Sequence, residues 1–544
     1  MQRPKPVREE HVVAIAAALL ALASLFYCSR HNLLLLYGDA VAHLHIARRV
    51  IDSLNPGFRQ LGSVWLPLPH VLLMPLVQNM SWWQTGMAGA LPSMVCYVAG
   101  CVGLYRLARM WMPASGATVA AAFYGLNPGL LYMQTTAMTE PLFLAEMIWG
   151  ALLAAETLRA LDSERNRDRA DKNSETHEPG RVGGLLLALA LVLDAAVYTR
   201  YDGWIYGACT WMVVAARMVR RKQWRRPAGG AFMLFTALLL AAPLLWMAYN
   251  AKQFHDPLDF LRGPYSAKAI EERTATPGMP HYPGWHSMPV AALYFLKAAE
   301  AGAVPLEWAN RLLLLAIAGT VAGVGAWHGR GVSAALLLWI PLPFYAYSIA
   351  YGSVPLFIPL WWPHSWYNTR YGMELLPAFA LFLAMLAAWL MTVADLLRPR
   401  AGRWLSGLIF LLMALNSVQL MRATPLVLEE AVANSKTRIP YERVLADAIL
   451  RLPGDGQILM YTSEHIGAVQ QAGIPLKRTI NESDFLLWQA ALKDPAKAAP
   501  FAIVTEGDPL SKAVAAHPGG LTLLEVVCSS GQPCARIYRS DTAR

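Results

Sequence analysis

The stretch YGDAVAHLHIARRVIDSLNPGFRQLGSVWLPLPH, residues Tyr37–His70, is a polar segment that directly follows the first long apolar run, at about 11–28. Asp39 stands near its start. A carboxylate at the end of a membrane span costs free energy unless water, a partner or a substrate compensates its charge. The position of Asp39 therefore predicts a functional site at this end of the span.

The composition indicates a membrane protein. The chain of 544 residues is 56% hydrophobic and 15% charged, whereas soluble domains carry about 25% charged residues. The net charge of +10 does not point to nucleic acid, because Lys and Arg lie in short loops between apolar runs. That distribution is typical of cytoplasmic loops and anionic-lipid contact.

Eleven apolar runs are long enough to cross about 30 Å of hydrocarbon. They lie at approximately 11–28, 84–107, 115–134, 137–157, 182–199, 204–219, 228–249, 304–327, 332–350, 372–395 and 404–421. The loops at 106–109, 159–181, 217–226, 330 and 398–403 carry the cations. One orientation, with the N-terminus inside and the C-terminus outside, puts all of them on the cytoplasmic side. The predicted fold class is an all-α polytopic membrane domain, over 1–421.

From about residue 422 the composition changes. Short apolar runs at 457–461, 501–504, 521–527 and 535–538 alternate with amphipathic stretches at 441–451, 466–472, 485–493 and 510–517. Alternating helix and strand signals predict a small extracytoplasmic α/β domain over 422–544. Cys528 and Cys534 bracket a turn there, and they are candidates for a disulfide if this part lies outside the cytosol.

Asp39 and Glu140 are the leading candidates for chemistry. Asp39 opens an amphipathic helix that is expected to lie on the membrane, and it could instead be only the N-cap of that helix. Glu140 follows Thr139 at a turn between two spans, where Thr139 could cap the next helix and Glu140 could favour its N-terminus. Asp39, His43 and Glu140 could also hold a metal ion, although a hydrogen-bonded histidine is the simpler reading of His43.

Two arginines lie near outer ends of spans. Arg200 and Asp202 could pair with each other, or Arg200 could bind an anion that Asp202 orients. Arg370 follows Tyr367 in YNTRYG, and the guanidinium fork suits phosphate oxygens. A carboxylate can deprotonate an acceptor hydroxyl and arginines can stabilise a departing phosphate. The set therefore favours transfer from a lipid phosphate.

At Gly38-Asp39, Thr139-Glu140-Pro141, Thr199–Gly203 and Asn368–Gly372 the chain resembles the GT-C superfamily of polyprenyl-phosphate-sugar-dependent glycosyltransferases. It is most similar to bacterial relatives of protein O-mannosyltransferases and of the lipid A aminoarabinose transferase. The resemblance covers roughly 1–421. It implies a bacterial inner-membrane enzyme with an extracytoplasmic site that transfers one sugar, of hexosyl or mannosyl type, with inversion.

The resemblance also implies roles for residues. Asp39 would be the base and Glu140 would position acceptor or donor. Arg200, Arg370 and Tyr367 would hold the donor phosphate, supported by a shell of His43, Asp202 and Tyr201. The partners would be a polyprenyl-phosphate-linked sugar, a hydroxyl-bearing protein, lipid or glycan, and the bilayer, with no required cofactor.

The chain departs from the family pattern at two places, and these departures limit which reactions of the family are expected. Ala40 follows Asp39, where protein O-mannosyltransferases usually show paired acids. Trp361-Trp362-Pro363 stands in a loop, whereas oligosaccharyltransferases carry Trp-Trp-Asp in a large soluble domain. Transfer of a whole glycan to Asn is therefore disfavoured, as is a catalytic divalent metal.

Two other functions remain open at the level of sequence. A transporter or flippase would usually show internal repeats and ionisable residues near the midplane. Here no repeat is visible and the polar residues gather at one face, with Glu146 and Asp194 as the exceptions. A non-catalytic assembly or binding protein would use the C-terminal domain as its working part.

Overall fold

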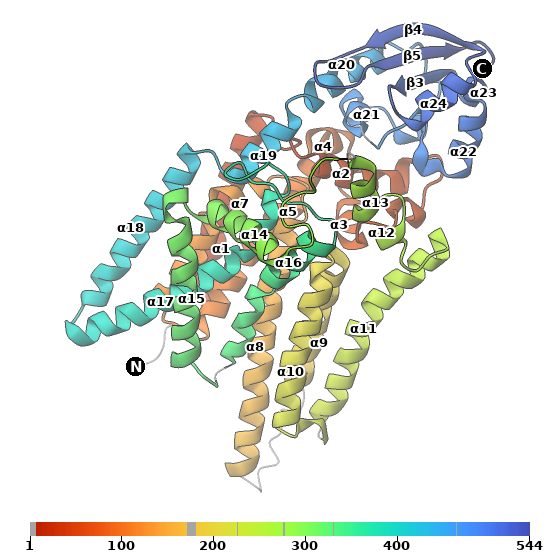
Figure 1. Ribbon diagram of the computed structural model, residues 1–544. Coiled ribbons are helices and arrows are strands. Elements are labelled where there is room, and N and C mark those ends of the chain that lie inside the picture. Colours follow the sequence, from red (N-terminus) through yellow and green to blue (C-terminus); the bar gives the residue numbers. More distant parts are fainter. Residues whose placement is uncertain are drawn as a thin grey trace.

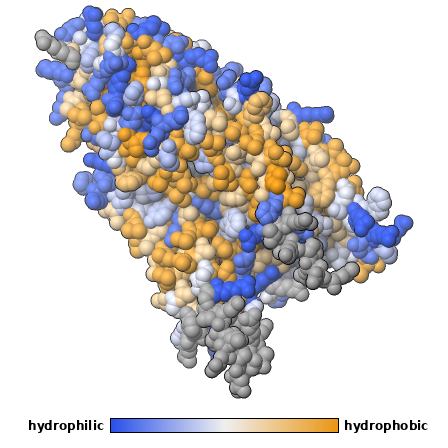
Figure 2. Space-filling view, turned by 180° about the vertical axis from the view of Figure 1, so that it is seen from behind, coloured by the Kyte–Doolittle hydropathy of each residue, from blue (hydrophilic) through white to orange (hydrophobic). Residues whose placement is uncertain are grey.

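The computed structural model describes residues 7–170, 181–225, 227–275, 278–329, 331–463 and 465–543. Residues 171–180, 226 and 330, which belong to the predicted cationic loops, lie outside the described residues. Figure 1 shows long helices below a smaller C-terminal domain that carries the sheet. In the view of Figure 2, hydrophobic residues gather over the helical part, and hydrophilic residues are concentrated towards the C-terminal domain.

The helices follow in chain order, with short helices between the long ones. The first half contains α1 (Val7–Arg30), α2 (Gly38–Asp52), η1 (Phe58–Leu61), α3 (Pro67–Leu73), α4 (Met80–Thr85), α5 (Met87–Arg109), α6 (Ala114–Gly125), α7 (Pro128–Met133), α8 (Glu140–Ala170), α9 (Arg181–Thr199), α10 (Asp202–Arg220), η2 (Gln223–Arg225) and α11 (Pro227–Phe254). The second contains α12 (Asp259–Arg262), α13 (Ala267–Thr274), α14 (Met288–Ala303), η3 (Leu306–Trp308), α15 (Ala309–Ala326), η4 (Val332–Trp339), α16 (Pro341–Tyr351), η5 (Thr369–Leu375), α17 (Leu376–Leu397) and α18 (Ala401–Arg422).

Nine helical segments of the described chain are long and apolar enough to cross a membrane. They coincide with nine of the eleven predicted spans: Glu9–Arg30, Met87–Arg109, Glu140–Ser163, Arg181–Thr199, Ala228–Phe254, Leu306–Ala326, Val332–Tyr351, Thr369–Leu397 and Ala401–Ser435. The protein is therefore a multi-pass membrane protein.

The other two predicted spans differ in instructive ways. The run at 115–134 is not one helix, because the chain breaks after α6 and Asn127 caps α7 by accepting a hydrogen bond from Leu130 N. The run at 204–219 does form one helix, α10, of 19 residues, a length of about 28 Å. It is more polar than the nine, yet it runs alongside α8, α9 and α11 in Figure 1.

The helix that follows the first span is not the surface helix that its amphipathic pattern predicted. Most of α2 is buried, including both its apolar stripe and the side chains of His43, His45 and Arg48. The reason is that α2 is packed between two parts of the protein. It contacts α3 and η1 of the membrane domain, and it contacts α21 (Ile466–Ala472) and η6 (Leu476–Arg478) of the C-terminal domain. The buried polar side chains of α2, His43, His45 and Arg48, therefore contact protein and not lipid headgroups.

The C-terminal part contains α19 (Leu426–Ser435), α20 (Arg438–Leu450), α21 (Ile466–Ala472), η6 (Leu476–Arg478), η7 (Glu482–Asp484), α22 (Leu486–Lys493), α23 (Pro495–Ala498) and α24 (Pro509–Ala516) around a mixed sheet. The strands are β1 (Ile458–Met460), β2 (Thr479–Ile480), β3 (Phe501–Thr505), β4 (Leu521–Val527) and β5 (Ala535–Ser540), in the order β2-β1-β3-β5-β4. The pairs β1–β2 and β1–β3 are parallel, and β5 runs antiparallel to β3 and β4. Four strands and four helices lie where the sequence predicts them, and β2 is too short to be recognised from its pattern.

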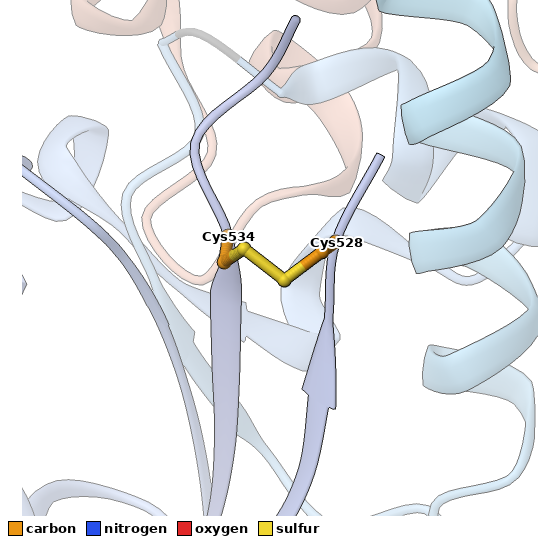
Figure 3. The surroundings of a disulfide bond; sticks show 2 residues. All are labelled: Cys528 and Cys534. Carbon is orange, nitrogen blue, oxygen red and sulfur yellow. A yellow bond between two sulfur atoms is a disulfide. The ribbon is translucent and has the colours of Figure 1, made fainter. Parts of the chain in front are cut away.

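A disulfide closes the β4–β5 hairpin. Figure 3 shows Cys528 and Cys534 joined where β4 ends and β5 begins. Their Cα atoms are 4.4 Å apart, a separation within the usual range for disulfides. The four other cysteines are free and lie in helices of the membrane domain.

Hydrogen bonds hold the C-terminal domain against the segment that contains α2. Arg438 donates from Nη2 to the carbonyl oxygens of Leu35 and Leu36, at 2.9 Å each. On the far end of α2, Arg49 Nη1 donates to Ser483 Oγ at 3.1 Å, and Asp52 accepts from Leu476 N at 3.3 Å. Both ends of this helix are therefore fixed by residues more than 380 positions later in the chain.

Candidate active site

Asp39 lies in the first turn of α2, at the edge of a buried cluster of charges. The N-cap position of α2 is Tyr37, without a side-chain cap, so the reading of Asp39 as N-cap is wrong. Its side chain is 42% exposed, and Arg370 Nη2 donates to its Oδ2 at 2.6 Å. Asp39 is thus a carboxylate open to an incoming molecule and held from behind by a guanidinium.

Arg370 comes from η5 and faces three carboxylates at once. Its Nη2 bonds Asp39, its Nε lies 3.2 Å from Glu140 Oε1, and its Nη1 lies 3.2 Å from Glu430 Oε1. Its side chain is 9% exposed. Nη2 and Nη1 donate hydrogen bonds to Asp39 and Glu430, whereas Nε is close to Glu140 without a hydrogen bond, and together these contacts set the orientation of the guanidinium.

Arg200 lies at the end of α9 and has partners of its own. It is 3.2 Å from Asp202 Oδ2, 3.4 Å from Glu140 Oε1 and 3.2 Å from Glu374 Oε1. Two hydroxyl groups accept from it as well, Thr139 Oγ1 at 2.9 Å and Tyr345 Oη at 2.7 Å. The predicted Arg200–Asp202 pair is present, within a larger network.

Glu140 links the two arginines. It stands at the start of α8, it is fully buried, and its Oε1 faces both Arg200 and Arg370. Its Oε2 has no hydrogen-bond partner among the residues that the structure describes. The ring of Tyr371 lies between the arginines, with guanidinium carbons 5.1 Å and 4.9 Å from its centroid. Such contacts add cation–π attraction to the ion pairs.

The cluster holds more acids than cations. Its acids are Asp39, Glu140, Asp202, Glu374 and Glu430, and its cations are Arg200 and Arg370. Burying a carboxylate without a matched cation is costly. A group that enters this site therefore meets arginines that are already paired, and it must replace one of their acidic partners.

The histidine of α2 is paired with another histidine. His43 Nδ1 lies 2.9 Å from His70 Nε2, and Trp65 packs against His43 with ring centroids 4.4 Å apart. Burial, reinforced by Arg370 and Arg200, lowers the pKa of His43 to about 3. His43 is therefore neutral at physiological pH. Among the described residues no group of three or more His, Cys, Asp or Glu side chains is arranged to hold a metal ion.

The two predicted tyrosines take different positions. Tyr201 donates to the carbonyl oxygen of Val64 at 2.8 Å and stacks on Phe260, so it fixes the loop before α3. Tyr367 forms a backbone bridge with Phe357, and its ring is 43% exposed. Burial and then the charge of Asp39 raise the pKa of Tyr367. Tyr367 therefore lies near Asp39, whereas the contacts of Tyr201 are with Val64 and Phe260.

The sequence reasoning missed two buried acids, Glu374 and Glu430. Glu374 belongs to the predicted span at 372–395, and an acid inside a span is a functional signal that could have found it. Glu430 follows the last predicted span, in the segment PLVLEEAV. Nothing in its local sequence distinguishes it from its neighbour Glu429, and only the packing of α19 brings it to Arg370.

Comparison with protein-family models and with curated protein sequences gives no match. Solved structures do match. ArnT from Cupriavidus metallidurans, in a crystal structure with bound undecaprenyl phosphate, aligns with a TM-score of 0.57 and 13% identity, over 96% of this chain and 97% of that one. The oligosaccharyltransferase AglB from Archaeoglobus fulgidus, in complex with an inhibitory peptide and a dolichol-phosphate, aligns with a TM-score of 0.47 and 11% identity, over 94% and 72%. The likeness to ArnT shows that this chain has a GT-C-like fold.

Proposed function

We propose that this chain is an integral membrane glycosyltransferase that moves one sugar from a polyprenyl-phosphate donor to a hydroxyl group of an acceptor, with inversion. The observation that carries the proposal is the half-exposed carboxylate of Asp39, bonded at 2.6 Å to a buried arginine. The GT-C-like fold supports it, because ArnT, which shares that fold over nearly its whole length, binds undecaprenyl phosphate.

In the proposed reaction Asp39 acts as the general base. Its carboxylate takes the proton of the acceptor hydroxyl, and the acceptor oxygen attacks the anomeric carbon of the sugar. The bond from that carbon to the phosphate oxygen breaks, and the electron pair leaves with the polyprenyl phosphate. Attack from the face opposite the leaving group inverts the anomeric carbon.

The proposed partners of the departing phosphate are Arg370, Arg200 and Tyr367. Of the nitrogens of Arg370, Nη2 is the one that meets the partly exposed Asp39, because Nε and Nη1 lie 3.2 Å from fully buried acids. We propose that a phosphate oxygen shares this edge while Asp39 turns to the acceptor. Charge that develops on the phosphate is then stabilised by a preorganised cation. Glu140 positions both guanidinium groups.

The remaining assignments extend the same proposal. The site and the α/β domain would lie on the extracytoplasmic side of a bacterial inner membrane, and the membrane and α/β domains would meet near residue 421. The disulfide in that domain supports an oxidising compartment. The donor sugar would be a hexose such as mannose, and the acceptor a protein, lipid or glycan.

The test uses the purified full chain in nanodiscs with synthetic polyprenyl-phosphate hexoses, and it measures release of free polyprenyl phosphate. We expect Asp39→Asn to reduce turnover by about 100-fold or more. Asp52→Asn is the matched control, because Asp52 lies on the same helix but pairs with Arg48. Wild-type turnover in Asp39→Asn would show that Asp39 is not the general base. Absence of release by folded wild type with any donor would reject the donor class and favour the transporter alternative, which vesicle uptake of labelled solute would detect.

A further inference from the structure

Glu430 is a fully buried acid on α19, the helix that follows α18, and it reaches the centre of the site. Its two oxygens face four donors. Oε1 accepts from Asn368 N at 2.8 Å and from Arg370 Nη1 at 3.2 Å. Oε2 accepts from Thr369 Oγ1, and it lies 3.3 Å from Tyr37 Oη, whose single proton has its shorter contact, 2.7 Å, with the carbonyl oxygen of Val427 on the same helix. No oxygen of this carboxylate is left without a donor.

These donors belong to the two segments that form the Asp39–Arg370 pair. Tyr37 is the residue before α2 and stands two positions from Asp39. Asn368 and Thr369 directly precede Arg370. Asn368 has a φ of 56°, in the left-handed region that is strained for most residues, and the bond from its N–H to Glu430 stabilises that turn. Helix α19 therefore contacts both halves of the proposed catalytic pair, the Arg370 segment through Glu430 and the Asp39 segment through Val427 and Glu430.

We propose that Glu430 is a positioning residue of the transfer reaction, so that α19 completes the active site. This inference rests on the proposed function. Glu430 holds Nη1 of Arg370 on the buried side, and Nη2 consequently points at Asp39 and the opening. Without it, the guanidinium keeps two acidic partners and can turn about its side chain. Small losses of alignment at a reacting centre have large effects on rate.

The experiment compares Glu430→Gln with Glu429→Gln in the full chain. Glu429 is the adjacent acid, partly buried, and accepts a hydrogen bond from Trp366 Nε1 at 3.3 Å. We expect Glu430→Gln to lower kcat by about tenfold or more, with the KM for the polyprenyl-phosphate hexose nearly unchanged. Glu429→Gln is expected to retain wild-type kcat.

A merely structural role would lower the melting temperature of Glu430→Gln while kcat per folded protein stayed at the wild-type level, and that result would overturn the inference. Equal losses of kcat in both variants would overturn it too. If Glu430→Gln does not fold, Thr369→Val replaces it, because this isosteric change removes one donor to Glu430. Full activity of folded Thr369→Val would then count against the role. Inactive wild type with every donor would instead overturn the proposed function, and this role with it.

Discussion

At the scale of single residues, the site is defined by how many acids each arginine meets. The three nitrogens of Arg370 lie within 3.2 Å of Asp39, Glu140 and Glu430, and two of them donate hydrogen bonds, to Asp39 and Glu430. A lysine ammonium is a compact charge and cannot span three such partners. The geometry of the guanidinium, rather than its charge alone, therefore keeps Asp39 in place.

Replacement of the Arg370 guanidinium by an ammonium group, in Arg370→Lys, is expected to impair the reaction. We expect turnover to fall by about 100-fold, because the charge persists but the fork is lost. Release of polyprenyl phosphate by the purified variant measures it. Arg262→Lys is the control, since Arg262 is 61% exposed and pairs with Asp256 away from the cluster. Comparable loss in both variants, or none in Arg370→Lys, would contradict the prediction.

A second prediction concerns His465 in the C-terminal domain. Burial lowers the pKa of His465 from 6.5 to about 4, and neither ring nitrogen has a hydrogen-bond partner among the described residues. As pH falls, the unfolded chain binds the proton first, so stability decreases from about pH 6.5 towards 4. Between about pH 7.5 and 5.5 the loss attributable to His465 is about 1 kcal/mol.

The measurement is the melting temperature of wild type and of His465→Leu across this pH range. The variant should lose less stability on acidification, while His43, whose pKa is also lowered, contributes equally to both proteins. His517→Leu, at an exposed position, is the control and should follow wild type. Identical pH dependence in all three would show that His465 does not contribute.

At the scale of elements, the approach of η5 to α14 sets the position of Arg370. A Cβ at Gly372 would collide with the backbone of Ala298 and Ala299. The absence of a side chain allows the backbones of the two elements to touch. In the segment Asn368–Gly372, the glycine is therefore required for close packing, and the arginine contacts the acids of the site.

Gly372→Ala is consequently expected to destabilise the protein by about 1–3 kcal/mol, as overpacked sites do. Its turnover should fall in parallel, because Arg370 moves with η5. Thermal unfolding in detergent tests the first effect. Gly302→Ala is the control. Gly302 lies on α14, the helix that Gly372 contacts, and a Cβ at Gly302 has open space around it. Equal melting temperatures for the two variants would show that the contact is not tight.

At the scale of the whole molecule, the C-terminal domain is part of the same structure as the membrane domain. Hydrogen bonds from Arg438 and to Asp52 fix both ends of α2, and α19 supplies Glu430 to the site. The division near residue 421 stays a prediction about sequence organisation. The contacts make the C-terminal segment a component of the site rather than an appendage, which argues against a purely separate binding role for it.

The predicted orientation makes a prediction at this scale. In intact spheroplasts, a membrane-impermeant maleimide applied after mild reduction should label Cys528 and Cys534, if they face outside. The free cysteines lie in membrane-domain helices and are expected to react poorly. A Cys528→Ser, Cys534→Ser double variant is the control and should lose the label. Labelling that requires lysis would place the domain, and with it the site, on the cytoplasmic side.

Much of this protein could be predicted from local sequence. Nine spans, the α/β character of the tail and the residues Asp39, Glu140, Arg200 and Arg370 follow from apolar run length, periodicity and polar residues at span ends. Glu146 is one of the two acids inside predicted spans that would suit a transporter. In the structure it accepts a hydrogen bond from Thr199 Oγ1 at 2.9 Å. Short-range physics determines these features, because hydrophobic length and helix breaking act over a few turns.

The tertiary structure alone decided how those residues meet. Burial of α2, the pairing of His43 with His70 and the arrival of Glu430 at Arg370 depend on contacts between segments 27 to 60 or more positions apart. An ion pair has no sequence period, so its partners are chosen by the packing of whole helices. The sequence by itself therefore determined which chemical groups are available at this face of the membrane. Only the packing decided which acid each arginine holds, because charge pairing acts over a few ångströms in space, however far apart the residues lie along the chain.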